Sequence, residues 1–148
     1  MPLKRPKAWI AIAVPAFFLL AAGDLALRSR GALLRAEQEE SWRDNPGAKK
    51  AYFENLYSGK NASGGDAAAE SPEAAARAAN LKAAELEFRV SESSAKMAYV
   101  WYKTAAQDFY LPFNPWADKA RARLPAALAA WRAELEAKGV KVEEWMIK

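Results

Sequence analysis

One stretch near the amino terminus limits what this chain can fold into more than any other feature. Residues 8–27 read AWIAIAVPAFFLLAAGDLAL and carry no charged side chain until Asp24. As a helix rising 1.5 Å per residue, this stretch is about 30 Å long, the thickness of a bilayer's hydrocarbon core. We therefore predict a single membrane-spanning helix over residues 8–27. We expect its anchor residues to be Trp9, Pro15, Phe17, Phe18 and Asp24.

Three of these anchor residues have specific expected roles. Trp9 suits the headgroup region, where aromatic rings are enriched. Pro15 removes one backbone hydrogen bond at mid-span and favours a kink. Asp24 stands four residues before Arg28, the spacing of a favourable helix ion pair, and we expect that pair to form. The alternative role for Asp24 is to meet a basic partner within the bilayer.

The charges that flank the apolar stretch indicate its orientation. Lys4, Arg5 and Lys7 precede it with no acid to offset them, and cytoplasmic ends are enriched in Lys and Arg. Arg28 and Arg30 make the far flank basic as well. A short cytoplasmic tail over residues 1–7, followed by an exported chain, is the simplest arrangement. We expect the protein in the inner membrane of a bacterium, N-in and C-out, with its bulk in the periplasm.

A secretory signal peptide is the alternative interpretation of the same stretch. It also has a basic start, an apolar middle and small residues near its end, here at 21–23. The apolar run is longer than the 7–15 residues usual for the core of a signal, which favours a retained anchor. Cleavage would instead release an independent periplasmic binding module for the cell wall or a small ligand.

The residue inventory of the chain argues against catalysis. The sequence contains no Cys and no His, which removes thiolate chemistry, the commonest general base and the commonest zinc ligand. Acidic side chains occur in clusters, but none is in a pattern that forces two carboxylates together in an apolar pocket, as acid–base catalysis requires. We therefore expect no enzyme, no cofactor and no metal.

The basic residues are spread along the chain rather than gathered on one element. The net charge is +4 and the sequence pI is about 9.3. No segment resembles the polybasic surface of a nucleic-acid-binding fold. The excess charge fits attraction to anionic lipid headgroups near the anchor, so membrane lipid is an expected partner and nucleic acid is not.

Residues 28–57 are predicted to form a juxtamembrane helical segment. The membrane helix should continue through Arg43 and end at Asn45-Pro46, because a residue that precedes proline disfavours helix. Asn45 can then cap a second short helix that begins with Pro46 and ends near Tyr57. Residues 58–71 are rich in Gly, Ser and Asn and are predicted to be a flexible linker.

Residues 72–148 are predicted to form a helical hairpin with a carboxyl-terminal tail. Ser71 caps a helix that begins with Pro72, and the polar run 91–94 is a place where that helix can kink or break. A turn over 111–115 leads to a last helix that Asn114 caps and Pro115 begins. Pro125 lies inside this helix and should bend it or split it into two. Gly139 is expected to end it. One face of this helix is apolar, at Trp116, Ala120, Leu124, Ala127, Leu128, Trp131 and Leu135.

Aromatic residues are dense between Met97 and Trp116. They are either the core of the hairpin, packed against the apolar face of the last helix, or a surface that recognises a protein or a small ligand. Tyr99, Tyr102 and Phe109 share one helix face, whereas Trp101 points elsewhere. The candidate partner-binding residues are Trp101, Tyr110, Phe113, Trp145 and Met146.

The fold expectation is all-α, with a single N-terminal transmembrane helix extended into a small exported helical hairpin or bundle. The function expectation is a non-catalytic accessory, scaffold or assembly subunit of a larger bacterial membrane complex. Its expected partners are other subunits of that complex, because its apolar helix faces exceed what a short chain can cover alone.

Overall fold

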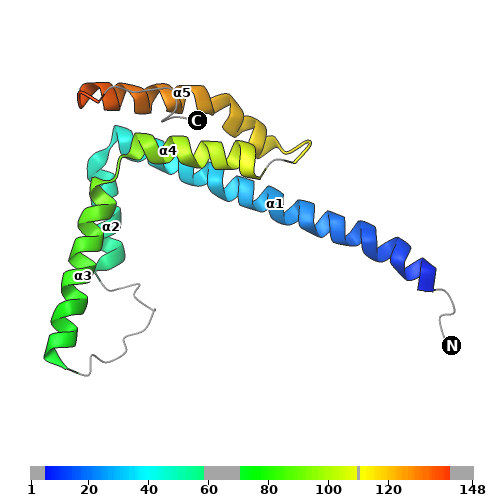
Figure 1. Ribbon diagram of the computed structural model, residues 1–148, viewed down its shortest axis with the longest axis horizontal. Helices are drawn as coiled ribbons and strands as arrows, with labels where there is room; N and C mark the ends of the chain where they lie inside the picture. The colour runs from blue at the N-terminus through cyan, green and yellow to red at the C-terminus, as the bar shows by residue number, and fades with distance from the viewer. Residues whose placement is uncertain (1–5, 59–70, 110, 141–148) are drawn as a thin grey trace.

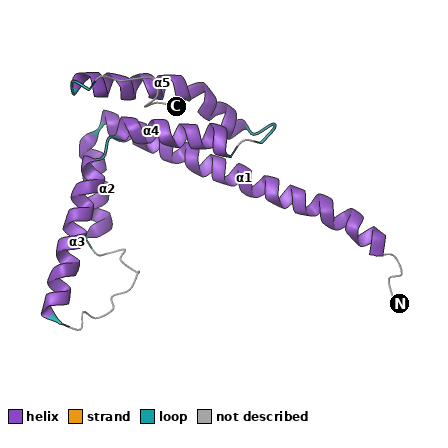
Figure 2. Cartoon of the chain, viewed as in Figure 1, coloured by secondary structure: helices purple, strands orange, loops and turns teal. Residues whose placement is uncertain are grey.

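The computed structural model describes residues 6–58, 71–109 and 111–140, and within these ranges the chain is helical with no strand. The all-α prediction is confirmed. One long amino-terminal helix is followed by several shorter ones (Figures 1 and 2). In chain order they are α1 (Pro6–Asp44), α2 (Pro46–Tyr57), α3 (Pro72–Ser91), α4 (Ser94–Lys103), the π-helix η1 (Thr104–Asp108) and α5 (Pro115–Ala137).

Helix α1 runs without a break from the apolar stretch into the folded part of the chain. Its second half packs against α4, η1 and α5, which form a three-layered bundle with it (Figure 1). At Asp44 the chain turns sharply, and α2 and α3 lie side by side as an arm that points away from this bundle. Segments from both sides of the predicted linker therefore pack against each other. Residues 59–70, which are most of that linker, lie outside the described residues.

Helices α2, α3 and α5 each begin where a short polar side chain precedes proline. Asn45 Oδ1 accepts from the Ala48 amide at 3.2 Å, and Ser71 Oγ accepts from the Ala74 amide at 3.2 Å. Asn114 Oδ1 accepts from the Trp116 amide at 3.2 Å. Each cap satisfies one of the amides that lack a partner in the first turn, where proline needs none. All three predicted helix starts are confirmed.

The polar run 91–94 breaks the third helical segment in two. The Ser93 hydroxyl accepts from the Lys96 amide at 3.1 Å and so caps α4, while Glu92 has an extended backbone that ends α3. By contrast, α5 continues through Pro125 as one helix whose ribbon bends part-way along (Figure 1). Proline removes one backbone hydrogen bond, which permits that bend.

The predicted end of α5 at Gly139 is also confirmed. Gly139 has φ 73°, and its amide donates to the Glu136 carbonyl at 2.9 Å. The Val140 amide donates to the Leu135 carbonyl at 3.0 Å, which completes a Schellman motif. The tail over residues 141–148, including Trp145 and Met146, lies outside the described residues.

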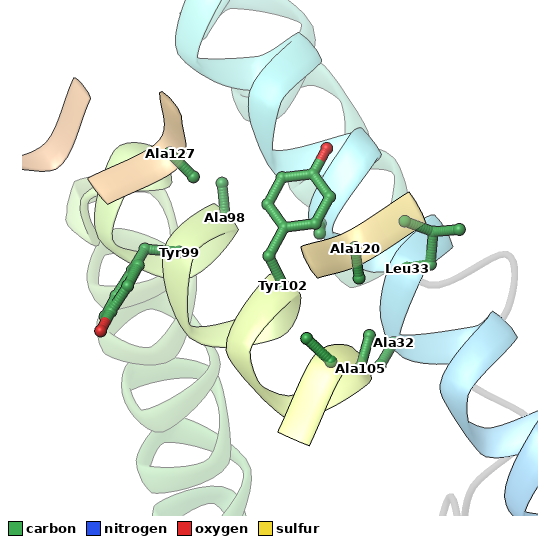
Figure 3. Packing of buried hydrophobic residues seen from close by; sticks show 10 residues of the cluster. Ala32, Leu33, Ala98, Tyr99, Tyr102, Ala105, Ala120 and Ala127 are labelled. Carbon is green, nitrogen blue, oxygen red and sulfur yellow. The ribbon is translucent and has the colours of Figure 1, made fainter. Parts of the chain in front are cut away.

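The core between α1, α4 and α5 is built mainly from alanine. Small side chains at Ala32, Ala98 and Ala120 let the three helix backbones approach closely (Figure 3). Tyr102 is the largest fully buried side chain, and its ring fills the space among these alanines. Tyr99 stacks on Trp131 with ring centroids 5.4 Å apart. Tyr99 and Tyr102 are thus core residues, as the first of the two interpretations of the aromatic run proposed.

The π-helix η1 lies where α4 ends beside α1. A π-helix leaves carbonyls displaced from the ordinary helical pattern, and such turns are rare. The Ser29 hydroxyl donates to the Ala105 carbonyl at 3.1 Å, and Arg121 Nη2 donates to the Ala106 carbonyl at 3.5 Å. Side chains from α1 and α5 therefore donate hydrogen bonds to two carbonyls of η1 and join η1 to both helices.

Within the described residues, one helix is long and apolar enough to cross a membrane, and it is α1. Only 6% of its apolar window is buried inside the structure, which argues against a core helix of a soluble bundle. Trp9, Phe17 and Phe18 are exposed along it, as are Pro15 and Asp24. Arg28 Nε lies 2.7 Å from Asp24 Oδ2, so the expected i, i+4 pair is present.

Candidate functional site

The sharp turn between α1 and α2 gathers three aromatic rings. Trp42, near the end of α1, lies 5.1 Å from Tyr52 and 5.4 Å from Phe53, measured between ring centroids. Tyr52 and Phe53 meet edge to face at 5.3 Å. Because Asn45 is the only residue between the two helices, the rings of α2 fold back directly on Trp42. Such edge and tilted contacts are the preferred geometries of aromatic pairs.

Next to these rings is a groove of about 230 Å³ between α1, α2, α3 and α4, which we call the elbow groove. Its walls are aromatic and aliphatic, with charges of both signs. The lining residues are Arg35, Gln38, Glu39, Trp42, Lys49, Tyr52, Phe53, Leu56, Arg89, Glu92, Met97 and Trp101.

Trp101 forms one wall of the elbow groove under a basic side chain. The guanidinium carbon of Arg35 lies 4.7 Å from the centre of the Trp101 ring, a cation–π contact between α1 and α4. Trp101 is half-buried and packs against the core on its other side. A side chain that enters the groove would therefore meet the Arg35 guanidinium stacked on a ring whose orientation the core fixes.

The floor of the elbow groove is polar. Lys49 is only 4% exposed, and its Nζ donates a hydrogen bond to the Glu92 carbonyl, where α3 ends. Glu39 lies close to Lys49; burial raises the pKa of Glu39, while a hydrogen bond from Ser94 and the charge of Lys49 oppose that rise. The Oε2 atom of Glu39 is buried and has no hydrogen-bond partner among the described residues. A buried acceptor of this kind favours a donor from a bound group.

A second cavity, also about 230 Å³, lies on the other side of Lys49 and reaches α5. There Ser93 Oγ donates to Glu134 Oε2 at 2.6 Å, and Lys138 Nζ lies 2.5 Å from Glu134 Oε1. Burial alone would raise the pKa of Glu134, but these two hydrogen bonds outweigh it and lower that pKa. Part-buried polar contacts, from Lys49 to the Glu92 carbonyl and from Ser93 to Glu134, thus link α2, the end of α3 and α5.

The groove combines aromatic walls with charges of both signs. Among the described residues no group of three or more carboxylates could hold a metal ion. Glu39 and Glu92 are accompanied by Lys49 and Arg89 in the same lining, so opposite charges are close by. Aromatic walls with a few placed charges are typical of surfaces that bind protein segments, in which Tyr, Trp and Arg are enriched.

The candidate partner-binding residues do not come together in one place. Trp101 lines the elbow groove, whereas Phe113 lies at the tip of the turn between α4 and α5 and is 100% exposed. Tyr110, Trp145 and Met146 lie outside the described residues.

Sequence reasoning did not select the other residues of the groove. Trp42 and Phe53 showed only ordinary helical spacing, and Arg35 and Lys49 were single charges among many. The one available signal was the Asn45-Pro46 corner, because so short a connection requires the ends of two helices to touch.

No protein-family model matches this chain, and no curated protein or solved structure matches it either. Function is therefore inferred from the residues themselves.

Proposed function

We propose that this protein is a non-catalytic accessory or scaffold subunit of a bacterial membrane complex. Helix α1 anchors it as a single pass, with the short amino-terminal tail in the cytoplasm and the helical part in the periplasm. Its partners are other subunits of the complex, together with membrane lipid. The elbow groove is the surface that receives a segment of a partner subunit.

The observation that carries this proposal is the exposed apolar surface around the elbow. Tyr52 and Leu56 line the groove and remain about half exposed, and Leu81 and Phe88 on α3 are 70% and 62% exposed. These side chains belong to the arm of α2 and α3, outside the core of α1, α4 and α5. Apolar surface concentrated on one part of a molecule is typical of a protein interface.

The arm also has a second groove, which shares no lining residue with the elbow groove. It measures about 340 Å³ and lies between α2 and α3, lined by Leu86, Val90 and Ala83 together with charged side chains. The apolar lining and the charged rim match the anatomy of a protein interface, in which a dry centre is surrounded by polar residues.

The test is co-purification from native membranes in mild detergent, with every recovered protein identified by mass spectrometry. We compare the tagged wild-type chain with Leu56→Glu, which places a charge in the elbow groove. Leu34→Glu is the matched control, because Leu34 is a similarly exposed leucine on α1 that does not line the groove. We expect a constant set of membrane subunits with the wild type and the control, and its loss with Leu56→Glu at unchanged helicity.

Two results would contradict the proposal. Recovery of the same subunits with Leu56→Glu would exclude the elbow groove as the docking surface. A soluble fragment that begins near Gly23 and carries no partner would replace the anchored subunit with a secreted binding module.

A further inference from the structure

The turn between α4 and α5 exposes a large apolar side chain in an unfavourable backbone conformation. Phe113 has φ 64° and is fully exposed. A left-handed conformation is uncommon for a bulky residue, since Cβ crowds the following carbonyl. The turn is held by the Asn114 amide, which donates to the Leu111 carbonyl at 3.2 Å, and by the buried Asn114 side chain. The ring is therefore displayed by a fixed turn.

Two hydrogen bonds fix the register of this turn against α1. Ser94, at the start of α4, bonds Glu39, and Ser29 bonds the Ala105 carbonyl, just past the end of α4. Helix α4 therefore runs antiparallel to α1, and the chain that follows it heads toward the amino-terminal half of α1. Figure 1 shows the turn on the side of the bundle that faces that half.

This register brings the turn to the end of the apolar stretch. Ser29 lies only about 7.5 Å along the helix axis from Asp24, at 1.5 Å per residue. Beyond Ala105 the chain continues through η1 in the same direction before it turns back. Leu25 and Ala26 are half-buried, whereas Leu20 and Leu27 are 75% and 63% exposed, so one face of α1 is already covered at this level.

We propose that the turn over residues 111–114 is a second membrane contact, with the Phe113 ring inserted in the lipid interface beside the anchor. This inference rests on the proposed anchoring of α1. Aromatic rings settle at the headgroup level, and burying an exposed Phe in the interface removes apolar area from water. Leu111 and Pro112 add apolar surface on the same turn.

The charges around the turn agree with a lipid partner. Arg30 is exposed on α1 just beyond the apolar stretch, as is Arg28, which also pairs with Asp24, and Lys103 is half-buried at the end of α4. Basic side chains at this height can contact anionic headgroups, each worth about 1 kcal/mol near the surface. The bundle is then held to the bilayer at two places, α1 and the turn.

The absence of cysteine from the chain makes this inference directly testable. A single cysteine is placed at position 113 by Phe113→Cys and labelled with an environment-sensitive fluorophore. Leu20→Cys in the apolar stretch serves as the lipid control, and Glu136→Cys, at the opposite end of α5, serves as the water control. Each full-length labelled protein is reconstituted into vesicles of zwitterionic and anionic phospholipid that carry a nitroxide either at the headgroup or deep in the acyl chain.

We expect the label at position 113 to shift its emission to the blue relative to position 136 and to be quenched most by the headgroup nitroxide. The label at position 20 should be quenched most by the deep nitroxide. Water-like emission at 113 with lipid quenching at 20 would overturn the turn contact and leave the anchor intact. Water-like emission at both positions would mean that the anchor itself has failed. A blue-shifted label at 113 that neither nitroxide quenches would indicate a protein contact and would also overturn the inference.

Discussion

Tyr102 joins a fully buried ring to a polar end at the edge of the core. Its hydroxyl donates to Glu40 Oε2 at 2.7 Å, and Arg123 Nη1 lies 3.6 Å from the same oxygen. Burial and the hydrogen bond to the Glu40 carboxylate both raise the pKa of Tyr102 above its ordinary value of 10.0. The phenol therefore stays neutral and remains a donor at every pH at which the protein is expected to work.

The two parts of the Tyr102 side chain make separable contributions to stability. Tyr102→Phe removes one hydrogen bond and should lower the free energy of unfolding by about 1 kcal/mol. Tyr102→Ala also leaves a cavity among small neighbours and should lower it by about 3–5 kcal/mol. Denaturant unfolding followed by circular dichroism in detergent measures both. Equal losses from the two substitutions would show that the ring does not fill the space between the helices.

Glu134 gives the stability a dependence on pH. Its folded pKa lies below the ordinary value of 4.5, so its contribution is present above about pH 4.5 and is lost as the pH falls through the folded pKa. Glu134→Gln should lower the free energy of unfolding at pH 7 by about 1 kcal/mol, through weaker bonds to Ser93 and Lys138. Unfolding curves recorded across pH 3–7 should converge at the acid end. A loss that stays constant with pH would contradict the role of the carboxylate charge.

At the level of elements, the ends of helices and the pairing of α4 with α5 were predictable, whereas the packing of α1 against both was not. Asn45, Ser71 and Asn114 define helix starts because a cap is a contact between residues only a few positions apart. The alanine core was predicted only in part. Ala120 and Ala127 belong to the predicted apolar face, whereas Ala36 on α1 was not selected, since alanine is common both on exposed helix faces and in close helix contacts. The elbow groove joins Arg35, Tyr52 and Trp101, which no local pattern connects.

The two faces of α1 should respond oppositely to a larger side chain. Ala36 is fully buried against the bundle, so Ala36→Leu should overpack that contact and lower the free energy of unfolding by about 1–3 kcal/mol. Gly31 is exposed on the same helix, with nothing within 4 Å of an added Cβ. Gly31→Ala should raise the free energy of unfolding by about 0.5–1 kcal/mol through helix propensity. The same unfolding assay compares them, and similar effects would show that α1 has no buried face.

At the scale of the whole molecule, the chain divides into an apolar half-helix, an alanine-packed bundle and an arm. The bundle is closed by ion pairs between α1 and α5, such as Lys119 Nζ to Glu37 Oε1 at 2.7 Å. The arm has no buried residue on α3 and meets the rest of the described structure mainly through α2 and the elbow. The elbow groove therefore lies where this arm meets the core helices α1 and α4.

Because α1 is unbroken, its length sets the distance between the apolar stretch and the turn into α2. From Arg28 to Asp44 the helix rises about 24 Å at 1.5 Å per residue, so in a membrane-anchored chain the turn between α1 and α2 lies at a fixed distance along α1 from the bilayer. The direction in which the arm points around the α1 axis is fixed as well. Each residue inserted between Arg28 and Asp44 would move the arm 1.5 Å along that axis and rotate it by about 100°. A docking partner therefore has to present its matching segment at that distance from the bilayer and on that side of α1.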